Sequence, residues 1–297
     1  PISRSYFKMI EILIDRTILD PFENSETTAC CLCEGPGGFV QAINEIAQRI
    51  KCRLSPIHCV TLISKEKKIP NWKLQQLSNY KLHFGKDGTG DIYNIDNIDD
   101  VVSKVNKNSI YLITADGGFD FSADFNSQEI EFQQLLLSEI YTALLLQKKG
   151  GVFVVKVYDL FDINTIRLLS LLHLVYEKVD IYKPKSSRPA NSEKYLLCSN
   201  YQVDKTTTHM LESLRNCIIQ RNLKSLDNIL KPEYVHRVQD YIFEYNTLYV
   251  ENQIAYINNT LNVIKFNSYF DKNQHIEKCK EWCIQYGIPI KHESLVV

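Results

Sequence analysis

Four segments of this sequence place lysines and carboxylates next to short apolar runs. Lys8 lies in a helix-like stretch near the start of the chain, and Asp116 directly follows an apolar run. Lys156 lies near the end of another apolar run, and Glu193 closes a basic, proline-containing segment. A lysine in an apolar run is costly unless it is paired, so Lys156 requires a partner. Two lysines held close together lower each other's pKa, and burial lowers it further, so one of them could act as a base near neutral pH.

A glycine-rich turn follows the first apolar run. The stretch Cys30-Cys-Leu-Cys-Glu-Gly-Pro-Gly-Gly-Phe39 indicates a buried strand, a turn and the start of a helix. Glycines let the backbone approach a ligand closely, and the first turn of a helix offers unpaired N–H groups. The pattern is neither a P-loop, because no lysine follows, nor the dinucleotide pattern G-x-G-x-x-G. It suits a compact nucleoside ligand without a pyrophosphate, such as S-adenosylmethionine, although a turn alone could also require the glycines.

Strand-like and helix-like segments alternate up to about residue 200, and they must position these side chains. Such alternation is typical of an α/β fold with a mostly parallel sheet, here of seven strands, and helices on both faces. Ligands bind such sheets beyond the carboxyl ends of the strands, where the four ionisable residues fall. The predicted strands are 30–33, 57–63, 80–84, 110–115, 152–157, 179–182 and 195–198, and the predicted helices are 3–19, 38–50, 95–105, 126–147 and 162–175.

After residue 201 the sequence changes character. Gly287 is the only glycine, and apolar residues at helical spacing predict helices near 207–222, 232–264 and 272–286. This part carries 11 acidic and 11 basic residues, so we expect no strong electrostatic role for it. We therefore predict two domains, an α/β domain at residues 1–201 and a C-terminal α-helical extension at residues 202–297.

The composition excludes several classes of protein. With 44% hydrophobic and 23% charged residues, the 297-residue chain can bury a substantial core, which excludes wholesale disorder. A net charge of -1 argues against a protein that coats nucleic acid through bulk positive charge. No apolar run approaches the roughly 20 residues that span a bilayer, so we expect no membrane role. The nine cysteines are an odd number without a secretory signal, which indicates reduced thiols in a cytosolic compartment.

Taken together, these motifs resemble the FtsJ/RrmJ class of RNA ribose 2′-O-methyltransferases. The resemblance rests on the four ordered ionisable residues and on Cys-Glu-Gly-Pro-Gly-Gly-Phe at 33–39. Within that class the chain is most similar to cap 1 messenger RNA methyltransferases, through Ala-Asp-Gly-Gly-Phe at 115–119, Lys-Val-Tyr-Asp-Leu-Phe at 156–161 and Lys-Pro-Lys-Ser-Ser-Arg-Pro-Ala-Asn-Ser-Glu at 183–193. The resemblance extends from about residue 3 to residue 201, and it implies a Rossmann-like fold with S-adenosylmethionine as methyl donor. No metal is implied, because a sulfonium is already an activated electrophile.

The resemblance implies roles for individual residues. A ribose 2′-hydroxyl is a poor nucleophile, so the site must position its oxygen and accept its proton. Lys156 would be the base and Asp116 would orient it, while Lys8 and Glu193 would complete the tetrad and hold the hydroxyl. The implied cofactor contacts are Cys33, Glu34, Gly35, Pro36, Gly37, Gly38, Phe39, Asp91, Ile92 and Asp116.

The expected RNA contacts come from one of two basic segments. Residues 64–81 carry five lysines against one glutamate, and residues 178–194 carry five basic residues against two acidic ones. We favour the second for phosphate contact because it contains a tetrad residue, whereas the first is equally compatible with a solvated face. The candidate RNA-binding residues are Asn126, Gln128, Lys185, Ser186, Arg188 and Asn191.

Other functions remain open at this stage. Ribosomal or other structured RNA is an alternative substrate to the 5′ end of capped messenger RNA. A non-catalytic RNA-binding or scaffold subunit is a further alternative. The reason for this last alternative is the stretch Val60-Thr-Leu-Ile-Ser-Lys65, which lacks the acidic residue that many relatives use to bind ribose. The capping or transcription machinery is the expected protein partner.

Two weaker signals concern the source and a metal. Abundant Ile, Asn, Lys and Tyr suggest an A/T-rich genome such as that of a large cytoplasmic DNA virus, which would put the protein in the host cytoplasm or virion. A cellular homologue would be nuclear.

His275, Cys279 and Cys283 are spaced four residues apart in the sequence and could bind zinc. We favour a helical stripe of small thiols because no C-x-x-C motif accompanies them.

Overall fold

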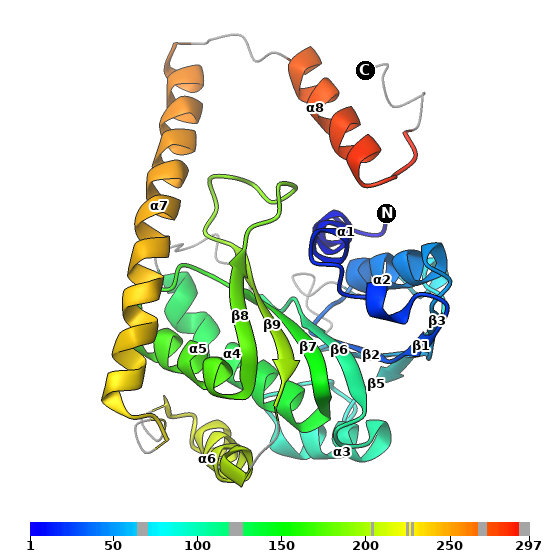
Figure 1. The fold of residues 1–297 in the computed structure, drawn as a ribbon, viewed down its shortest axis with the longest axis vertical. Coiled ribbons are helices and arrows are strands. Elements are labelled where there is room, and N and C mark those ends of the chain that lie inside the picture. The colour runs from blue at the N-terminus through cyan, green and yellow to red at the C-terminus, as the bar shows by residue number, and fades with distance from the viewer. Residues whose placement is uncertain are drawn as a thin grey trace.

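A seven-stranded sheet forms the centre of the protein (Figure 1), as seen in a computed structural model. The structure describes residues 1–63, 71–118, 127–202, 205–223, 226, 229–266 and 272–290. The strand order is β5-β4-β2-β6-β7-β9-β8, and only the pairs that involve β9 are antiparallel. The strands are β2 (Ala29–Leu32), β4 (Ile57–Val60), β5 (Tyr80–His83), β6 (Ile110–Ala115), β7 (Gln147–Val157), β8 (Tyr176–Tyr182) and β9 (Lys194–Tyr201). The predicted α/β fold with a mostly parallel sheet is confirmed.

Helices cover both faces of the sheet because neighbouring strand residues point to opposite sides. In β2, Cys31 packs with α1 (Ser5–Asp15) and α2 (Gly38–Arg49), whereas Cys30 packs into the cluster on the other face. That second cluster contains α3 (Ile95–Val105), α4 (Gln128–Leu146) and α5 (Ile163–Val175). The short elements are η1 (Asp20–Phe22), η2 (Leu74–Gln76) and a separate parallel pair of β1 (Glu26–Thr27) with β3 (Arg53–Leu54).

Local sequence explains where several elements begin. Asn94 caps α3 by accepting a hydrogen bond from the Asp96 amide, and Asp162 caps α5 in the same way through the Asn164 amide. The strand β6 and the helix α3 have the predicted bounds. The apolar run at 152–157 is only the second half of β7, because the polar residues that precede it continue the strand.

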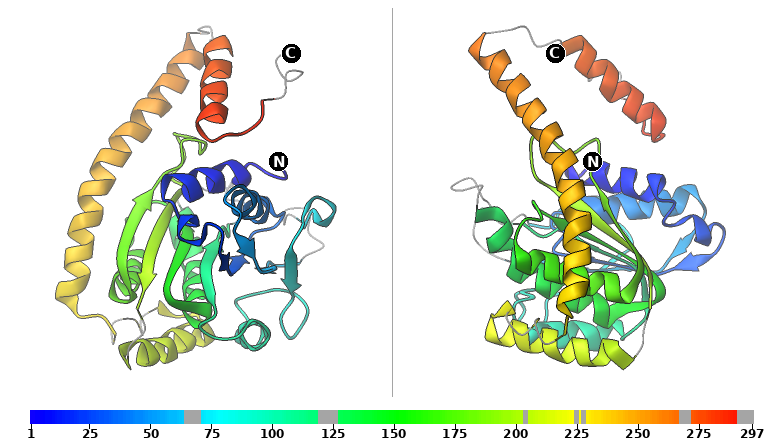
Figure 2. Two further views of the ribbon diagram at one scale, coloured as in Figure 1. Left: turned by 45° about the vertical axis from the view of Figure 1, so that its right-hand side comes forward. Right: turned by 60° about the vertical axis from the view of Figure 1, so that its left-hand side comes forward.

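The C-terminal extension consists of α6 (Lys205–Gln220), α7 (Pro232–Lys265) and α8 (Lys272–Gln285). Helix α6 buries Leu214 against the cluster on the α4 face, and the first half of α7 buries Ile242 there. Helix α7 then continues beyond the sheet, and α8 lies near α1 on the other side (Figures 1 and 2). The extension therefore packs on both faces of the α/β unit, while the predicted domain boundary stays a prediction.

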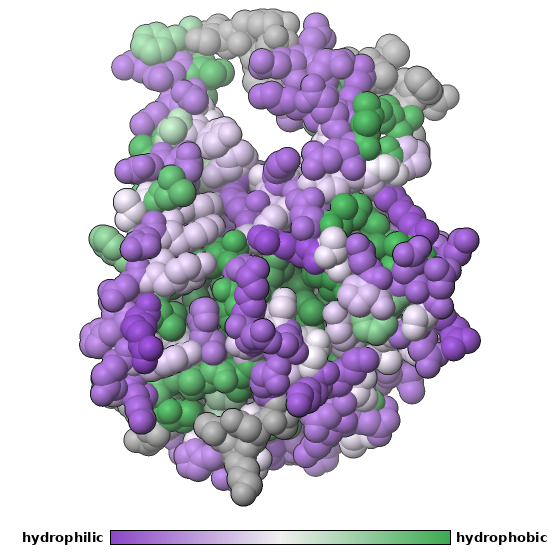
Figure 3. Space-filling model, in the orientation of Figure 1, coloured by the Kyte–Doolittle hydropathy of each residue, from purple (hydrophilic) through white to green (hydrophobic). Residues whose placement is uncertain are grey.

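No helix within the described parts of the chain is both long enough and apolar enough to cross a bilayer. On the face shown in Figure 3, apolar residues come to the surface at the centre, and hydrophilic residues surround them.

Candidate active site

The strand register brings three of the four predicted catalytic residues to one edge of the sheet. Asp116 directly follows β6, and Lys156 is the penultimate residue of β7, which runs parallel to β6 with Ala115 opposite Val155. Strand β9 runs the other way, with Lys156 opposite Tyr195, so Glu193 precedes β9 at the same edge. The carboxyl ends of parallel strands are where such sheets bind ligands.

The four residues form two ion pairs. The Lys156 ammonium lies 3.1 Å from an Asp116 carboxylate oxygen and donates to the Asp116 carbonyl at 2.8 Å. Lys8 reaches in from α1 and contacts both carboxylate oxygens of Glu193, at 2.7 and 2.9 Å. Lys156 and Glu193 are buried, with 7% and 8% of their surface exposed, so each charge is partnered where water is scarce. The structure thus brings the predicted tetrad together.

Charge pairing reverses the predicted shift of the Lys156 pKa. Burial alone lowers the pKa of Lys156, but the attraction of Asp116, Tyr158 and Glu193 outweighs it, so this pKa lies above its ordinary value. The prediction of a lowered pKa is wrong because each lysine has a carboxylate as its nearest charge, not the other lysine. Burial alone would raise the pKa of Glu193, yet Lys8 and Lys156 hold it below its ordinary value.

Hydroxyl groups that the motifs did not single out hold the tetrad in place. The Tyr195 hydroxyl donates to the Asp116 carboxylate at 2.9 Å, and the Ser187 hydroxyl donates to Glu193 at 2.8 Å. Tyr195 points to the same side as Lys156 because it is its partner across β7 and β9, a signal that only the strand pairing reveals. Gly118 lies against this group, since an added Cβ would stand 3.2 Å from the Lys156 nitrogen.

The glycine turn packs tightly against α1. Gly37 has a φ of 115°, which a glycine adopts readily, and α2 begins at Gly38. A Cβ at Gly38 would stand 2.2 Å from the Ser3 hydroxyl and 2.8 Å from the backbone nitrogen of Tyr6. Glu34 closes the turn by accepting the Phe39 amide at 2.7 Å. The turn is therefore required by packing as well as suited to a ligand.

Two buried carboxyl groups, Glu34 and Glu139, lie near the carboxyl ends of β2 and β6. Glu34 keeps one oxygen without a hydrogen-bond partner among the described residues, and so does Glu139 of α4. Glu139 also accepts the Gly117 amide at 3.2 Å and bonds to the Cys33 thiol. Burial raises the pKa of both carboxyl groups to about 8, so both are mainly protonated at neutral pH. The sequence gave no signal for Glu139, which resembles any polar residue in a helix.

A sheet of this kind binds ligands at the carboxyl ends of β2 and β6, and we call this region the cofactor crevice. It lies where the strand order reverses, because β4 and β6 flank β2 and continue away from it in opposite directions. The orphaned oxygens of Glu34 and Glu139 can take hydrogen bonds that the folded chain does not supply. Asp91 and Ile92 follow Gly90, which packs against the carbonyl of Thr61 at the end of β4. The predicted cofactor residues are thus gathered around the ends of adjacent strands.

A cavity of about 940 Å³ opens beside the tetrad. Two of its walls are the segment of Tyr158 to Asp162 with the start of α4, and the segment of Arg188 to Glu193. It contains three of the predicted RNA-binding residues, Gln128, Arg188 and Asn191, and one residue from the extension, Gln253 of α7. Phe161 ends the motif at 156–161 but was given no role from the sequence, and it has 59% of its surface exposed at this cavity.

The other three predicted RNA-binding residues are Lys185, Ser186 and Asn126. The backbone amides of Lys185 and Ser186 donate to the Glu11 carboxylate at 2.6 and 2.7 Å, and neither residue lines the cavity. Asn126 lies outside the described residues, as does much of the basic segment 64–81. Within the described part of that segment, Lys73 donates to the Ile2 carbonyl at 2.9 Å.

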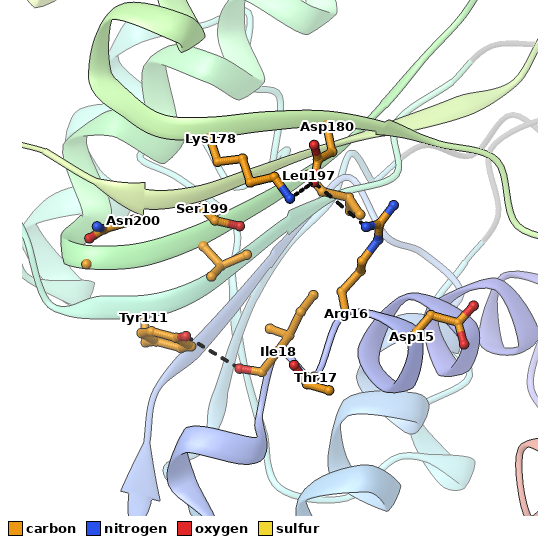
Figure 4. A pocket seen from close by; sticks show the side chains of 12 residues that line it. Asp15, Arg16, Thr17, Ile18, Tyr111, Lys178, Asp180, Leu197, Ser199 and Asn200 are labelled. Carbon is orange, nitrogen blue, oxygen red and sulfur yellow. Dashed lines mark hydrogen bonds and ion pairs between the residues drawn. The ribbon is translucent and has the colours of Figure 1, made fainter.

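A second cavity, of about 440 Å³, lies at the opposite edge of the sheet (Figure 4). Its lining includes Tyr111 and Gly150, which stand toward the amino ends of β6 and β7. Its charged groups satisfy one another, with Asp180 at 2.7 Å from Lys178 and 3.8 Å from Arg16. No tetrad residue lines it, so we do not assign it to the reaction.

The predicted thiol stripe lies on α8. Cys279 stands 3.8 Å from the His275 ring, and Cys283 is half-buried on the same helix. Among the described residues, no group of three histidine, cysteine or acidic side chains is arranged to hold a metal ion.

Comparison with known proteins adds an independent line of evidence. The profile of a family described as FtsJ-like methyltransferase matches residues 1–201. A mouse protein named cap-specific mRNA (nucleoside-2'-O-)-methyltransferase 1 is 29% identical over 279 residues, which cover 85% of this chain and 33% of the mouse protein. A Drosophila melanogaster protein named cap-specific mRNA (nucleoside-2'-O-)-methyltransferase 2 is 32% identical over 206 residues, which cover 64% of this chain and 29% of that protein. The chain spans about a third of the length of these relatives.

Solved structures give a weaker likeness. A Plasmodium falciparum protein assigned as a ribosomal RNA methyltransferase superposes on 69% of this chain and all of its own. The TM-score is 0.49 and the sequence identity is 22%.

Proposed function

This chain belongs to the FtsJ-like methyltransferase family, and we propose that it methylates a ribose 2′-hydroxyl of RNA, at the first transcribed nucleotide of capped messenger RNA. The observation that carries the proposal is the pair of buried ion pairs, Lys156 with Asp116 and Lys8 with Glu193, beside the cofactor crevice. Relatives that are named cap-specific mRNA methyltransferases support the choice of RNA.

S-adenosylmethionine is the cofactor of this family, and when bound it supplies an activated methyl group. The residues that would hold it are those of the turn Cys33 to Phe39, together with Asp91, Ile92 and Asp116. Glu34 and Glu139 fit this role through their orphaned oxygens, because a protonated carboxyl group can donate its O–H to a nucleoside and keeps some capacity to accept. Asp116 belongs both to these cofactor residues and to the tetrad, where it pairs with Lys156.

The tetrad residues then handle the ribose hydroxyl. Lys156 is the proposed base. Because its pKa lies above its ordinary value, only the small neutral fraction of Lys156, whose own proton has passed to solvent, can accept the hydroxyl proton. Asp116 and Glu193 stabilise the ammonium that results, which is the same attraction that raises the pKa of Lys156. Lys8 holds Glu193, so that the carboxylate can orient the hydroxyl instead of binding Lys156 directly.

The cavity beside the tetrad suits a single-stranded RNA end. Arg188 is exposed there and can contact a phosphate, and the exposed ring of Phe161 offers a face on which a base can stack. The cavity has a volume of about 940 Å³. This favours local contact with an RNA end over binding along a duplex.

Methyl transfer to short RNAs tests the proposal. We expect Lys156→Ala to lower the rate on capped RNA by about 100-fold or more, which is the usual contribution of a positioned base. The matched control is Lys104→Ala, which removes a lysine of α3 with 52% of its side chain exposed, outside both basic segments and both cavities. Equal activity of Lys156→Ala and the control would refute the assigned base.

The same assay compares capped and uncapped RNA of one sequence. We expect the capped RNA to be preferred. Equal rates would refute the cap as a determinant, and no transfer to any RNA would refute the activity itself.

A further inference from the structure

The loop between β8 and β9 is contacted by the C-terminal extension on two sides. We call residues 183–193 the substrate loop, because it ends in the tetrad residue Glu193 and lines the cavity beside it. Figure 1 shows this loop rising between α7 and α8, and both views of Figure 2 agree. The two helices come from the part of the chain that the family profile does not match.

Helix α7 binds the backbone of the substrate loop directly. The Tyr249 hydroxyl donates to the Asn191 carbonyl at 3.2 Å, and the Gln253 amide donates to the Ala190 carbonyl at 2.9 Å. Asn246, one turn before, donates to the Leu160 carbonyl at 2.8 Å on the facing wall of the cavity. One helix face therefore fixes both walls.

The Tyr249 ring also lies beneath two ammonium groups. The Lys183 nitrogen is 5.2 Å and the Lys194 nitrogen 4.6 Å from the ring centroid, which is within cation–π range. Lys183 in turn donates to the carbonyl oxygens of Asn191 and Glu193 at 2.7 and 2.8 Å. Burial lowers the pKa of Lys183 to about 8, and the ring favours its charged form at neutral pH. Tyr249 thus supports the lysine that fastens the loop next to Glu193.

Helix α8 holds the other end of the substrate loop through α1. The Trp282 indole donates to the Glu11 carboxylate at 2.8 Å. Glu11 is fully buried and accepts the amides of Lys185 and Ser186. A loop made largely of small and proline residues would otherwise sample many conformations, so these contacts offset the entropy of ordering it.

We propose that the C-terminal extension holds the substrate loop in the conformation that presents Glu193 to RNA, with Tyr249 as a positioning residue. The proposal rests on the proposed function for the identity of the substrate. It assigns a role to the extension that its balanced charge did not suggest.

Steady-state kinetics of the full chain tests the proposal with Tyr249 variants. We expect Tyr249→Leu to lower kcat/KM for capped RNA by about tenfold or more, because it removes the ring contacts and a hydrogen bond. Tyr249→Phe keeps the ring and should stay within about threefold of the wild type. The affinity for S-adenosylhomocysteine should not change in either variant, because the cofactor crevice is not touched.

Tyr256→Leu is the matched control, since Tyr256 lies two turns further along α7 with 52% of its surface exposed. The proposal is overturned if Tyr249→Leu behaves like Tyr256→Leu, or if it lowers the melting temperature and the cofactor affinity together with activity. Hydrogen exchange tests the positioning role of Tyr249 separately from the proposed function. If no RNA is methylated by the wild type, faster amide exchange at 185–193 in Tyr249→Leu than in the control still supports the positioning role, and equal exchange refutes it.

Discussion

The cofactor side and the RNA side of the site are built in different ways. The cofactor side starts from a continuous strand, turn and helix at 29–49, to which α4 adds Glu139, and its carboxyl groups at Glu34 and Glu139 are buried and mainly neutral. The RNA side combines α1, the ends of two strands, the substrate loop and α7, and its charges occur as ion pairs. A local motif supplies most of the cofactor side, whereas every part of the RNA side comes from a different segment of the chain.

Asp116 belongs to both sides, and its replacement should have the largest effect. Asp116→Asn keeps the size of the side chain but leaves the buried Lys156 ammonium without its charged partner. We expect methyl transfer to fall by about 100-fold or more. Asp180→Asn, which alters a half-buried carboxylate at the opposite edge of the sheet, should retain activity. A loss of less than fivefold in Asp116→Asn would contradict the shared role.

The neutral carboxyl groups of the cofactor side make stability depend on pH. The pKa of Glu34 and Glu139 is about 8 in the folded protein and near 4.5 in an unfolded chain, so the folded state holds more protons between these values. Their stabilising contribution is complete below pH 4.5 and is lost as the pH rises through 8. The free energy of unfolding should fall by about 1.4 kcal/mol per pH unit for each group in that window.

Urea denaturation between pH 6 and pH 8 measures this slope. Glu139→Gln should reduce the slope by the contribution of one carboxyl group. Glu131→Gln, which changes an exposed glutamate on the same helix, should leave the slope unchanged. An unchanged slope in Glu139→Gln would mean that this carboxyl group is ionised in the folded protein.

On the RNA side, Phe161→Ala should have a smaller effect than loss of the tetrad. Stacking of one base on an aromatic ring contributes about 1–3 kcal/mol, so we expect KM for RNA to rise by about tenfold with kcat little changed. Phe161→Tyr should restore the wild-type KM. The control is Phe243→Ala, because Phe243 is 73% exposed on α7 and does not line the cavity. An unchanged KM in Phe161→Ala would place the base elsewhere.

Much of the site could be predicted because motifs mark the ends of strands. Asp116 and Lys156 end predicted strands, and the register of β6 with β7 brings them together. Tyr195 and Glu139 could not be predicted, because each contacts the site through a packing partner far away in the sequence. The pKa of Lys156 was predicted in the wrong direction, since residue types do not reveal which charge lies nearest.

The sequence by itself determined the α/β fold, the glycine turn and the four ionisable residues, because hydrophobic periodicity and short motifs are local properties. Only the tertiary structure decided how the lysines pair, which carboxyl groups stay neutral and where the extension lies. These depend on distances between segments such as Lys8 and Glu193, which are 185 positions apart in the chain and 2.7 Å apart in space. Charge and burial act through space, so the chemistry of the site follows from the packing and not from the order of residues.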